Sequence, residues 1–287
     1  MVRLSRAEIL QAVQAALEED IGSGDVTTLS TVPESAVAQA LMVAREPLTL
    51  AGLEFAIQAF TSLLSTLVIK KEMEDGQRAS RGQTILSVQG SARAILTAER
   101  VALNFVQRLS GVATLAAQYV EAVRGTNAVI LDTRKTTPGW RRFEKYAVTC
   151  GGAANHRTGL YDMVLIKDNH LAAISGPADK VIQQAVSRAR SKYPEIKVEV
   201  EADTLEQVGQ AAEAGADFIL CDNMEPAMLR EAVKIVNGRS KTEASGGVNL
   251  STVRGIAETG INFISVGAMT HSARAVDVAL DFVPTNS

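Results

Sequence analysis

From about residue 128 onward, short apolar runs alternate with longer amphipathic segments. The apolar runs cover residues 128–132, 163–168, 196–201, 218–222, 241–245 and 263–267. The last four begin roughly 22 residues apart, and the segments near 203–214, 225–237 and 249–259 that separate them have helical periodicity. Repeated β-α units of this kind predict a parallel sheet or barrel with helices packed against its strands.

The N-terminal part of the chain has a different pattern. It predicts, in chain order, a helix at 5–20, a strand at 36–45, a helix at 52–64, a strand at 66–73, a glycine-punctuated strand hairpin at 74–90 and a helix from near Ser91. No low-complexity linker separates the two patterns, so the boundary must come from the change in periodicity. We expect a first domain at 1–108, joined by the C-terminal segment 270–287, and a second at 109–269.

Each apolar run of the second pattern ends in polar or small residues. These are Asp132, Lys167, Glu201, Asp222, Ser245 and Gly267. In α/β barrels the catalytic side chains lie at the carboxyl ends of the strands. The sequence therefore predicts that the active site is formed where these runs end.

Composition excludes several classes of protein. The chain has 287 residues, is 46% hydrophobic and 21% charged, and has a net charge of −3, which is typical of a soluble globular protein and gives no sign of a general nucleic-acid-binding or acidic-membrane-binding surface. Its longest uncharged stretch, residues 55–69, is too short and too polar to span a membrane. Cys150 and Cys221 form no C-x-x-C pair, which favours a reducing, cytoplasmic location.

Positive charge is concentrated in one segment of this acidic chain. Between Asp132 and Lys167 there are seven Lys or Arg residues against three Asp or Glu residues. Four of these cations and one histidine are candidates for binding an anion: Arg134, Lys135, His156, Arg157 and Lys167. Because Lys167 extends a strand that helices should cover, we expect its ammonium to be buried and to need an anionic partner. The set indicates a small substrate with several negative charges.

Carboxylates follow on the next strands. Glu199 and Glu201 alternate with valines, so both lie on one face of their strand, and Glu199 is equally consistent with a solvated side chain. Glu201 and Asp222, at neighbouring strand ends, could hold Mg²⁺ together with a phosphorylated substrate. Two carboxylates alone are a weak metal signal, so this interpretation depends on evidence for a phosphate.

The last two strands supply that evidence. Glycine and serine directly follow them, and backbone N–H groups in such loops commonly bind phosphate. The candidates are Ser245, Gly246, Gly247 and Gly267, with a plain glycine turn as the alternative for the Gly-Gly pair. The three histidines, His156, His170 and His271, are too scattered for a zinc triad, and we expect a structural role for His170. No nucleophile motif is present, so the predicted chemistry is electrostatic rather than covalent.

An ordered set of motifs from about residue 15 to 280 closely resembles the quinolinate phosphoribosyltransferase family. The motifs are EEDIGSGDVTT, AERVALNFVQRLSGVATL, DTRKTTPG, KYAV, GGAANHRTGLYDMVLIKDNH, VEVE, AGADFILCDN, EASGG and SVGAMTHSA. The resemblance implies an N-terminal α/β sandwich and an open, seven-stranded α/β barrel. It also implies a reaction in which quinolinate and phosphoribosyl pyrophosphate give nicotinate mononucleotide, pyrophosphate and CO₂, with Mg²⁺.

The resemblance further implies a role for each candidate residue. The quinolinate carboxylates would be held by Arg134, His156, Arg157 and Lys167, with Arg100 reaching the site from the neighbouring subunit of a homodimer. Lys135 would contact the pyrophosphate or the ribose phosphate, and Glu201 and Asp222 the ribose hydroxyls and the metal. The 5′-phosphate would be held by Ser245, Gly246, Gly247, Gly267 and His271. The binding order, the number of Mg²⁺ ions, loop closure and assembly into hexamers stay open.

One position departs from the family pattern, and other interpretations remain. Ala153 stands where a third glycine is usual, and its methyl group would crowd the loop if that residue needed a positive φ angle. A paralogue associated with molybdenum transport, or an enzyme using another pyridine base, would share most motifs. A different phosphate-binding barrel enzyme would leave Arg134, Arg157 and Lys167 unexplained. A non-catalytic binding protein would be expected to lack part of the ligand set.

Overall fold

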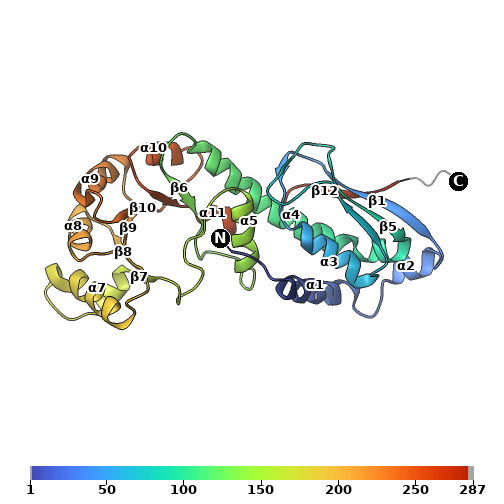
Figure 1. Cartoon of the computed structure of the whole chain (residues 1–287), viewed down its shortest axis with the longest axis horizontal. Coiled ribbons are helices and arrows are strands. Elements are labelled where there is room, and N and C mark those ends of the chain that lie inside the picture. Colours follow the sequence, from blue (N-terminus) through green and yellow to red (C-terminus); the bar gives the residue numbers. More distant parts are fainter. Residues whose placement is uncertain (1, 284–287) are drawn as a thin grey trace. The chain divides into compact units, whose positions relative to one another are not determined.

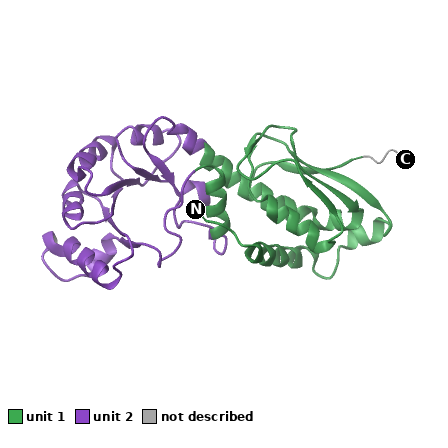
Figure 2. Cartoon of the chain, viewed as in Figure 1, with its two compact units in different colours: residues 1–117, 142–152, 272–287 green, residues 118–141, 153–271 purple. Residues whose placement is uncertain are grey.

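A computed structural model describes residues 2–283, which form two compact units. Of the described residues, the first unit contains 2–117, 142–152 and 272–283, and the second contains 118–141 and 153–271 (Figure 2). The last four residues of the expected C-terminal segment 270–287 lie outside the described part. The domain boundary at residue 108 stays a prediction. None of the helices in the described residues has the length and apolar character needed to cross a bilayer.

The first unit is an antiparallel sheet with helices (Figure 1). Its elements are α1 (Arg6–Ile21), α2 (Val26–Thr31), β1 (Val37–Ala44), β2 (Leu48–Thr49), α3 (Leu53–Leu63), β3 (Val68–Lys71), β4 (Arg78–Ala79), β5 (Thr84–Ser91), α4 (Ala92–Ala122), α5 (Arg141–Cys150) and β12 (Val278–Val283). The strand order is β12-β1-β5-β3, and the rings of Phe55 on α3 and Phe105 on α4 stack at 4.8 Å. The helices expected at 5–20, at 52–64 and from near Ser91 and the strands expected at 36–45 and 66–73 are confirmed, and β12 brings the C-terminal segment into the sheet.

One expected element of the first unit is wrong. The segment at 74–90 does not form a hairpin, because β4 pairs with β2 in a separate two-stranded sheet while β5 pairs with β1 and β3. One hydrogen bond and one glycine conformation turn the chain away between β4 and β5. The N–H of Gly82 donates to the carbonyl of Ala44, and Gly82 has a φ of +83°, a conformation that favours glycine.

The second unit is a parallel sheet with helices on its outer side (Figure 1). Its elements are β6 (Val129–Leu131), β7 (Val164–Ile166), α6 (Asp168–Ala172), α7 (Val181–Lys192), β8 (Val198–Ala202), α8 (Leu205–Glu213), β9 (Phe218–Asp222), α9 (Pro226–Val236), β10 (Lys241–Ser245), α10 (Val253–Ala257), β11 (Phe263–Ser265) and α11 (Ala268–His271). The strand order is β6-β11-β10-β9-β8-β7. The predicted parallel sheet is confirmed, and it forms an open barrel because β6 and β7 are its two edges.

The expected strand count is corrected. The resemblance implied seven strands, whereas the parallel sheet contains six among the described residues. The segment after α5 contributes only an isolated bridge between Leu131 and Ala154, because the chain leaves the edge of β6 at once to form the loop around His156.

Local signals explain where the barrel helices begin and end. Thr204 and Gln207 form a capping box at the start of α8, and Pro226 occupies the first turn of α9. Asn237 ends α9 in the left-handed conformation. Val198 and Val200 on β8 are fully buried. Each of these helices connects two parallel strands, so the carboxyl ends of all the strands lie at one edge of the sheet.

Candidate active site

A cavity of about 430 Å³ opens at the carboxyl ends of the barrel strands. It lies entirely within the second unit. Its lining consists of Thr133, Arg134, Lys135, His156, Arg157, Leu165, Lys167, Glu201, Leu220, Asp222, Glu243, Ser245 and Ser265. The structure therefore brings together most of the candidates that the sequence singled out, and it adds Glu243 and Ser265, which sequence reasoning missed.

Two arginines make one wall of the cavity cationic. The Nε of Arg134 is buried and has no hydrogen-bond partner in the described part of the chain. Arg157 donates from Nη1 to the carbonyl of Met163 at 3.1 Å, and burial together with the charge of Arg134 lowers its pKa. A buried donor without a partner is costly. This wall is thus suited to an anion that supplies the missing acceptor.

Arg141, which the sequence analysis did not single out, ties the two arginine loops together. Its Nε donates to Oγ1 of Thr136 at 3.1 Å, and its Nη1 donates to the carbonyl of Thr158 at 3.1 Å. Thr136 follows Arg134 and Thr158 follows Arg157 in the sequence. One guanidinium therefore fixes the spacing of the two loops, a role that no local pattern indicates.

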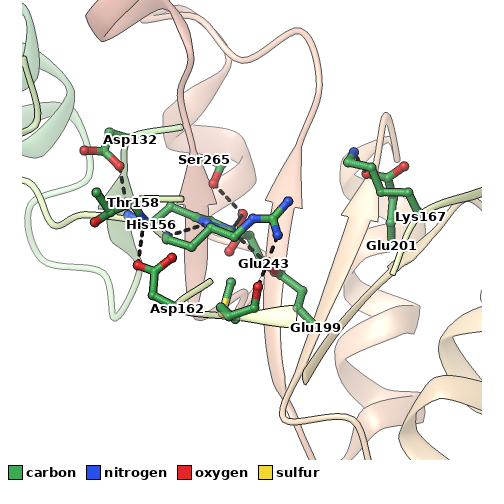
Figure 3. A network of polar contacts seen from close by, with 11 residues as sticks. Asp132, His156, Thr158, Asp162, Lys167, Glu199, Glu201, Glu243 and Ser265 are labelled. Carbon is green, nitrogen blue, oxygen red and sulfur yellow. Dashed lines mark hydrogen bonds and ion pairs between the residues drawn. The ribbon is translucent and has the colours of Figure 1, made fainter. Parts of the chain in front are cut away.

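Lys167 lines the same cavity as the two arginines, but it is less buried than the sequence predicted. Its ammonium donates to Oε2 of Glu201, so its partner is a carboxylate of the neighbouring strand (Figure 3). The Lys167 side chain is 43% exposed, so the prediction of a buried ammonium is wrong. It is exposed because β7 ends at Ile166 and the lysine follows at the open end of the barrel. His170 accepts a hydrogen bond at Nδ1 from the N–H of Lys167, at 2.9 Å.

In the barrel interior, a histidine meets two buried carboxyl groups (Figure 3). The Nε2 of His156 lies 3.0 Å from Oε2 of Glu199 and 3.5 Å from Oε1 of Glu243. Glu199 is fully buried, so the alternative of a solvated side chain is wrong. The reason is that the alternating glutamates of β8 face the barrel interior while the valines face the helices. Burial, followed by the neighbouring Glu199, raises the pKa of Glu243 to about 8.

The loop that carries His156 is anchored by Asp132, which follows β6. This aspartate is fully buried. Its carboxylate accepts from the N–H of His156 at 2.8 Å (Figure 3) and from Nδ2 of Asn155 at 2.7 Å. The polar residue at this strand end thus positions another site residue and does not line the cavity itself.

The glycine-bearing loops lie beside the cavity. Gly246 and Gly247 have φ angles of +95° and +60°. A Cβ at Gly246 would stand 2.1 Å from Oδ1 of Asn223, whereas Gly247 has open space. Gly267 brings two other candidates together, because a Cβ there would lie 3.1 Å from Nε2 of His271 and 3.3 Å from Cδ of Lys135. This grouping of a lysine, a histidine and glycine backbone is suited to a phosphate.

Glu201 and Asp222, the expected metal ligands, both line the cavity, but each is already hydrogen-bonded to another side chain. Asp222 accepts from Nδ2 of Asn223 at 2.7 Å, and Glu201 is engaged by Lys167. Each carboxylate has a second oxygen that is free to bind a cation brought by a substrate. Within residues 2–283, the group of three or more side chains with metal-like spacing is instead His156, Glu199 and Glu243.

Arg100 belongs to the first unit. Its side chain is exposed on α4, next to Glu99. Its predicted role in the site of a neighbouring subunit stays a prediction.

Comparison with known proteins places this geometry in a family. Residues 25–110 match the model described as quinolinate phosphoribosyl transferase, N-terminal domain, and residues 112–281 match the C-terminal domain of the same family. The chain belongs to the quinolinate phosphoribosyltransferase family. The matched ranges cover both units, so the resemblance stated from the motifs is confirmed along nearly the whole sequence.

Individual relatives agree with the family match. The chain is 42% identical to a nicotinate-nucleotide pyrophosphorylase [carboxylating] of Mycobacterium leprae, over 94% of this chain and 95% of that protein. It is 40% identical to a probable nicotinate-nucleotide pyrophosphorylase [carboxylating] of Bacillus subtilis, over 93% and 91%. The solved structure of the nicotinate-nucleotide pyrophosphorylase from Francisella tularensis matches with a TM-score of 0.92 at 36% identity, covering 98% of each chain.

Proposed function

We propose that this protein transfers the phosphoribosyl group from phosphoribosyl pyrophosphate to quinolinate and releases CO₂, giving nicotinate mononucleotide and pyrophosphate, a step of NAD biosynthesis. The observation that carries the proposal is the unpartnered Nε of Arg134, which faces the same cavity as Arg157 and Lys167. Two carboxylates on one pyridine ring require several converging cations. A base with a single carboxylate would leave part of this set without a partner.

The acid-binding residues act by orientation. Arg134 and Arg157 hold the quinolinate carboxylates from one wall, and Lys167 holds them from the other. Lys167 is already paired with Glu201, so the substrate carboxylate competes for an ammonium that the strand ends have fixed in place. Holding two anions that repel each other in a reactive alignment contributes up to roughly 7–11 kcal/mol in favourable cases.

The phosphorylated substrate occupies the other side of the cavity. Lys135, His271 and the backbone at Gly267 bind its phosphate groups together with Ser245, Gly246 and Gly247, and Lys135 stabilises the charge that develops as pyrophosphate leaves. Glu201 and Asp222 contact the ribose hydroxyls, and their carboxylate oxygens stabilise the positive charge at ribose C1. Their remaining oxygens fit Mg²⁺, which would neutralise pyrophosphate charge when bound.

Decarboxylation follows from the bond to the ring nitrogen. Attack of that nitrogen on ribose C1 makes a pyridinium, whose positive charge stabilises the electron pair left on the adjacent carbon when CO₂ departs. A proton then binds this carbon. The residues of the cationic wall keep the ring in place through both steps, so no covalent enzyme intermediate is needed.

We also propose the setting in which the enzyme works. It acts as a homodimer in which the exposed Arg100 of each subunit contributes to the site of its neighbour. The cytoplasm is the proposed location, and the unpaired Cys150 and Cys221 support a reducing compartment.

The test is product formation with quinolinate and with nicotinate in parallel, each with phosphoribosyl pyrophosphate and Mg²⁺. Nicotinate mononucleotide formed from quinolinate alone supports the proposal and the two-carboxylate clamp. Product from nicotinate alone would keep the phosphate site and overturn the choice of base. No product from either would favour the transport-associated paralogue.

A further inference from the structure

Beneath the cationic wall, three polar side chains from three different segments meet in the interior of the barrel. They are His156 from the loop between α5 and β7, Glu199 from β8 and Glu243 from β10 (Figure 3). The three groups lie within 4.8 Å of one another, and both carboxyl groups are almost completely buried. Glu243 also lines the cavity, so the group forms part of the floor on which a substrate would lie.

The hydrogen bonds of His156 define which nitrogen carries its proton. The Nδ1 accepts from the N–H of Arg157 at 2.7 Å, so this nitrogen is an acceptor. A neutral imidazole with an acceptor at Nδ1 carries its hydrogen at Nε2. The Nε2 that carries this hydrogen lies close to both Glu199 and Glu243, and Nδ1 fixes the backbone of Arg157. The ring links the carboxyl groups to the arginine that faces the cavity.

Glu199 lacks donors for its buried oxygens. Neither oxygen has a hydrogen bond of good geometry with a described residue, although His156 lies close to one of them. A buried carboxylate without donors is strongly unfavourable. A hydrogen on the neighbouring carboxyl group of Glu243 supplies one, because a protonated carboxyl is a donor. Glu243 in turn accepts at Oε1 from the hydroxyl of Ser265 on β11.

Burial and the charge of Glu199 raise the pKa of Glu243 more than the nearby His156 lowers it. Glu199 faces it from β8, the thiol of Cys221 faces it from β9, and the hydroxyl of Ser265 faces it from β11. Burial and then Glu243 raise the pKa of Cys221 to about 12, so this thiol is neutral. On the loop side stands the ring of His156, and the charge of Arg157 acts on Glu199 from the same loop. Two carboxylates this close, with such neighbours, cannot both carry charge at neutral pH.

A bound metal ion is a poor alternative for this group. An ion would need the lone pair of Nε2, and the acceptor role of Nδ1 places the ring hydrogen on that atom. The arrangement matches a hydrogen-bonded chain better than a coordination sphere.

We propose that Glu243 is a positioning residue that stays neutral, donates its carboxyl hydrogen to Glu199, and so fixes Glu199 and the ring of His156 beneath the substrate. The inference rests on the proposed function only where it concerns quinolinate. In this state the floor of the cavity carries one negative charge and tolerates a dianionic substrate. Loss of the Glu243 hydrogen adds a second negative charge beneath the substrate carboxylates, which weakens quinolinate binding.

The first test needs no activity. The resting protein, labelled with ¹⁵N-histidine, is observed by NMR between pH 6 and 9, and His156 is assigned among the three histidines with His156→Gln. The proposal expects a neutral ring with hydrogen at Nε2 throughout this range. A ring with hydrogen at Nδ1, a ring charged at neutral pH, or a shift of this signal on addition of Zn²⁺ alone would overturn it.

The second test uses the pH dependence of the KM for quinolinate. In the wild type, the KM for quinolinate should increase once the pH exceeds about 8. The increase should approach tenfold per pH unit, which is the limit when binding requires one proton, and kcat should change less. Glu243→Gln keeps a donor that cannot ionise, so its KM should not rise in that range. Glu243→Leu removes the donor and should raise the KM at every pH. Glu213→Gln, on the exposed end of α8, is the matched control and should keep the wild-type profile.

The outcomes separate the two proposals. If Glu243→Gln keeps the alkaline rise in KM, or behaves like Glu243→Leu, the positioning role is wrong even though the enzyme turns over quinolinate. If the wild type shows no turnover at all, the proposed function fails, and the NMR result alone decides the role of Glu243.

Discussion

The ammonium of Lys167 donates to the carboxylate of Glu201 across the ends of the neighbouring strands β7 and β8. The pair joins a residue proposed to bind quinolinate to one proposed to contact the ribose. Because the side chain of Lys167 is partly exposed, the pair can exchange partners when a substrate carboxylate arrives. With the roles proposed above, this one ion pair would link the two substrates at the mouth of the cavity.

The first prediction concerns this lysine. Lys167→Met removes a charged donor to the substrate and leaves Glu201 without its cation. A hydrogen bond to a charged group contributes about 1.5–3 kcal/mol, so kcat/KM for quinolinate should fall by roughly 10- to 100-fold, mainly through KM. Steady-state kinetics measures this. Lys192→Met, on the exposed end of α7, serves as the control and should leave both constants as they are.

The second prediction concerns the phosphate loop. Gly246→Ala places a methyl group 2.1 Å from Oδ1 of Asn223 at a backbone φ of +95°, so the loop must move. We expect the KM for phosphoribosyl pyrophosphate to rise about tenfold or more, since one phosphate contact is worth roughly 1.5–3 kcal/mol. Gly255→Ala, where a Cβ meets nothing within 4 Å, should have no effect. Equal kinetics for the two variants would show that the loop does not bind phosphate.

The third prediction settles the departure at Ala153. Among the described residues, the non-glycine residues with positive φ are Asn223 and Asn237, so the loop does not need a glycine at 153. Ala153 is instead buried at 6% exposure. Ala153→Gly should lower the free energy of unfolding by about 0.5–1 kcal/mol, because glycine gains more freedom in the unfolded chain. Chemical denaturation would show this, and an increase in stability would contradict it.

The fourth prediction is a pH dependence of stability. The folded chain raises the pKa of Glu243 from 4.5 to about 8, so it binds this proton more tightly than the unfolded chain does. The stabilisation is fully present below about pH 4.5 and is lost as the pH rises through about 8. The free energy of unfolding should therefore fall between pH 5.5 and 8.5 more steeply in the wild type than in Glu243→Gln. Parallel slopes would contradict the assignment.

The sequence predicted the barrel and the cationic side of the site for a physical reason. Buried parallel strands are short apolar runs, and the residue at which such a run ends marks the edge of the sheet where side chains converge. Arg134, Lys167 and Glu201 were found in this way. Within residues 2–283 the parallel sheet has six strands rather than seven, and the chain around Ala154 makes only one bridge to β6.

The interior of the site could not be predicted from local patterns. Glu199 and Glu243 each occur in a strand pattern that suits either a solvated or a buried carboxyl group. Only their meeting with His156, from a loop far away in the sequence, decides between these possibilities. Arg141 gives no local signal for the same reason, because its role depends on Thr158.

The most direct test of the central claim is the stoichiometry of the reaction of the wild-type protein with quinolinate labelled at its 2-carboxylate. With phosphoribosyl pyrophosphate and Mg²⁺, the account predicts labelled CO₂, pyrophosphate and nicotinate mononucleotide in equal amounts. It predicts none of the three when either substrate is left out. Pyrophosphate release without labelled CO₂, or a nucleotide that keeps both carboxylates, would contradict it.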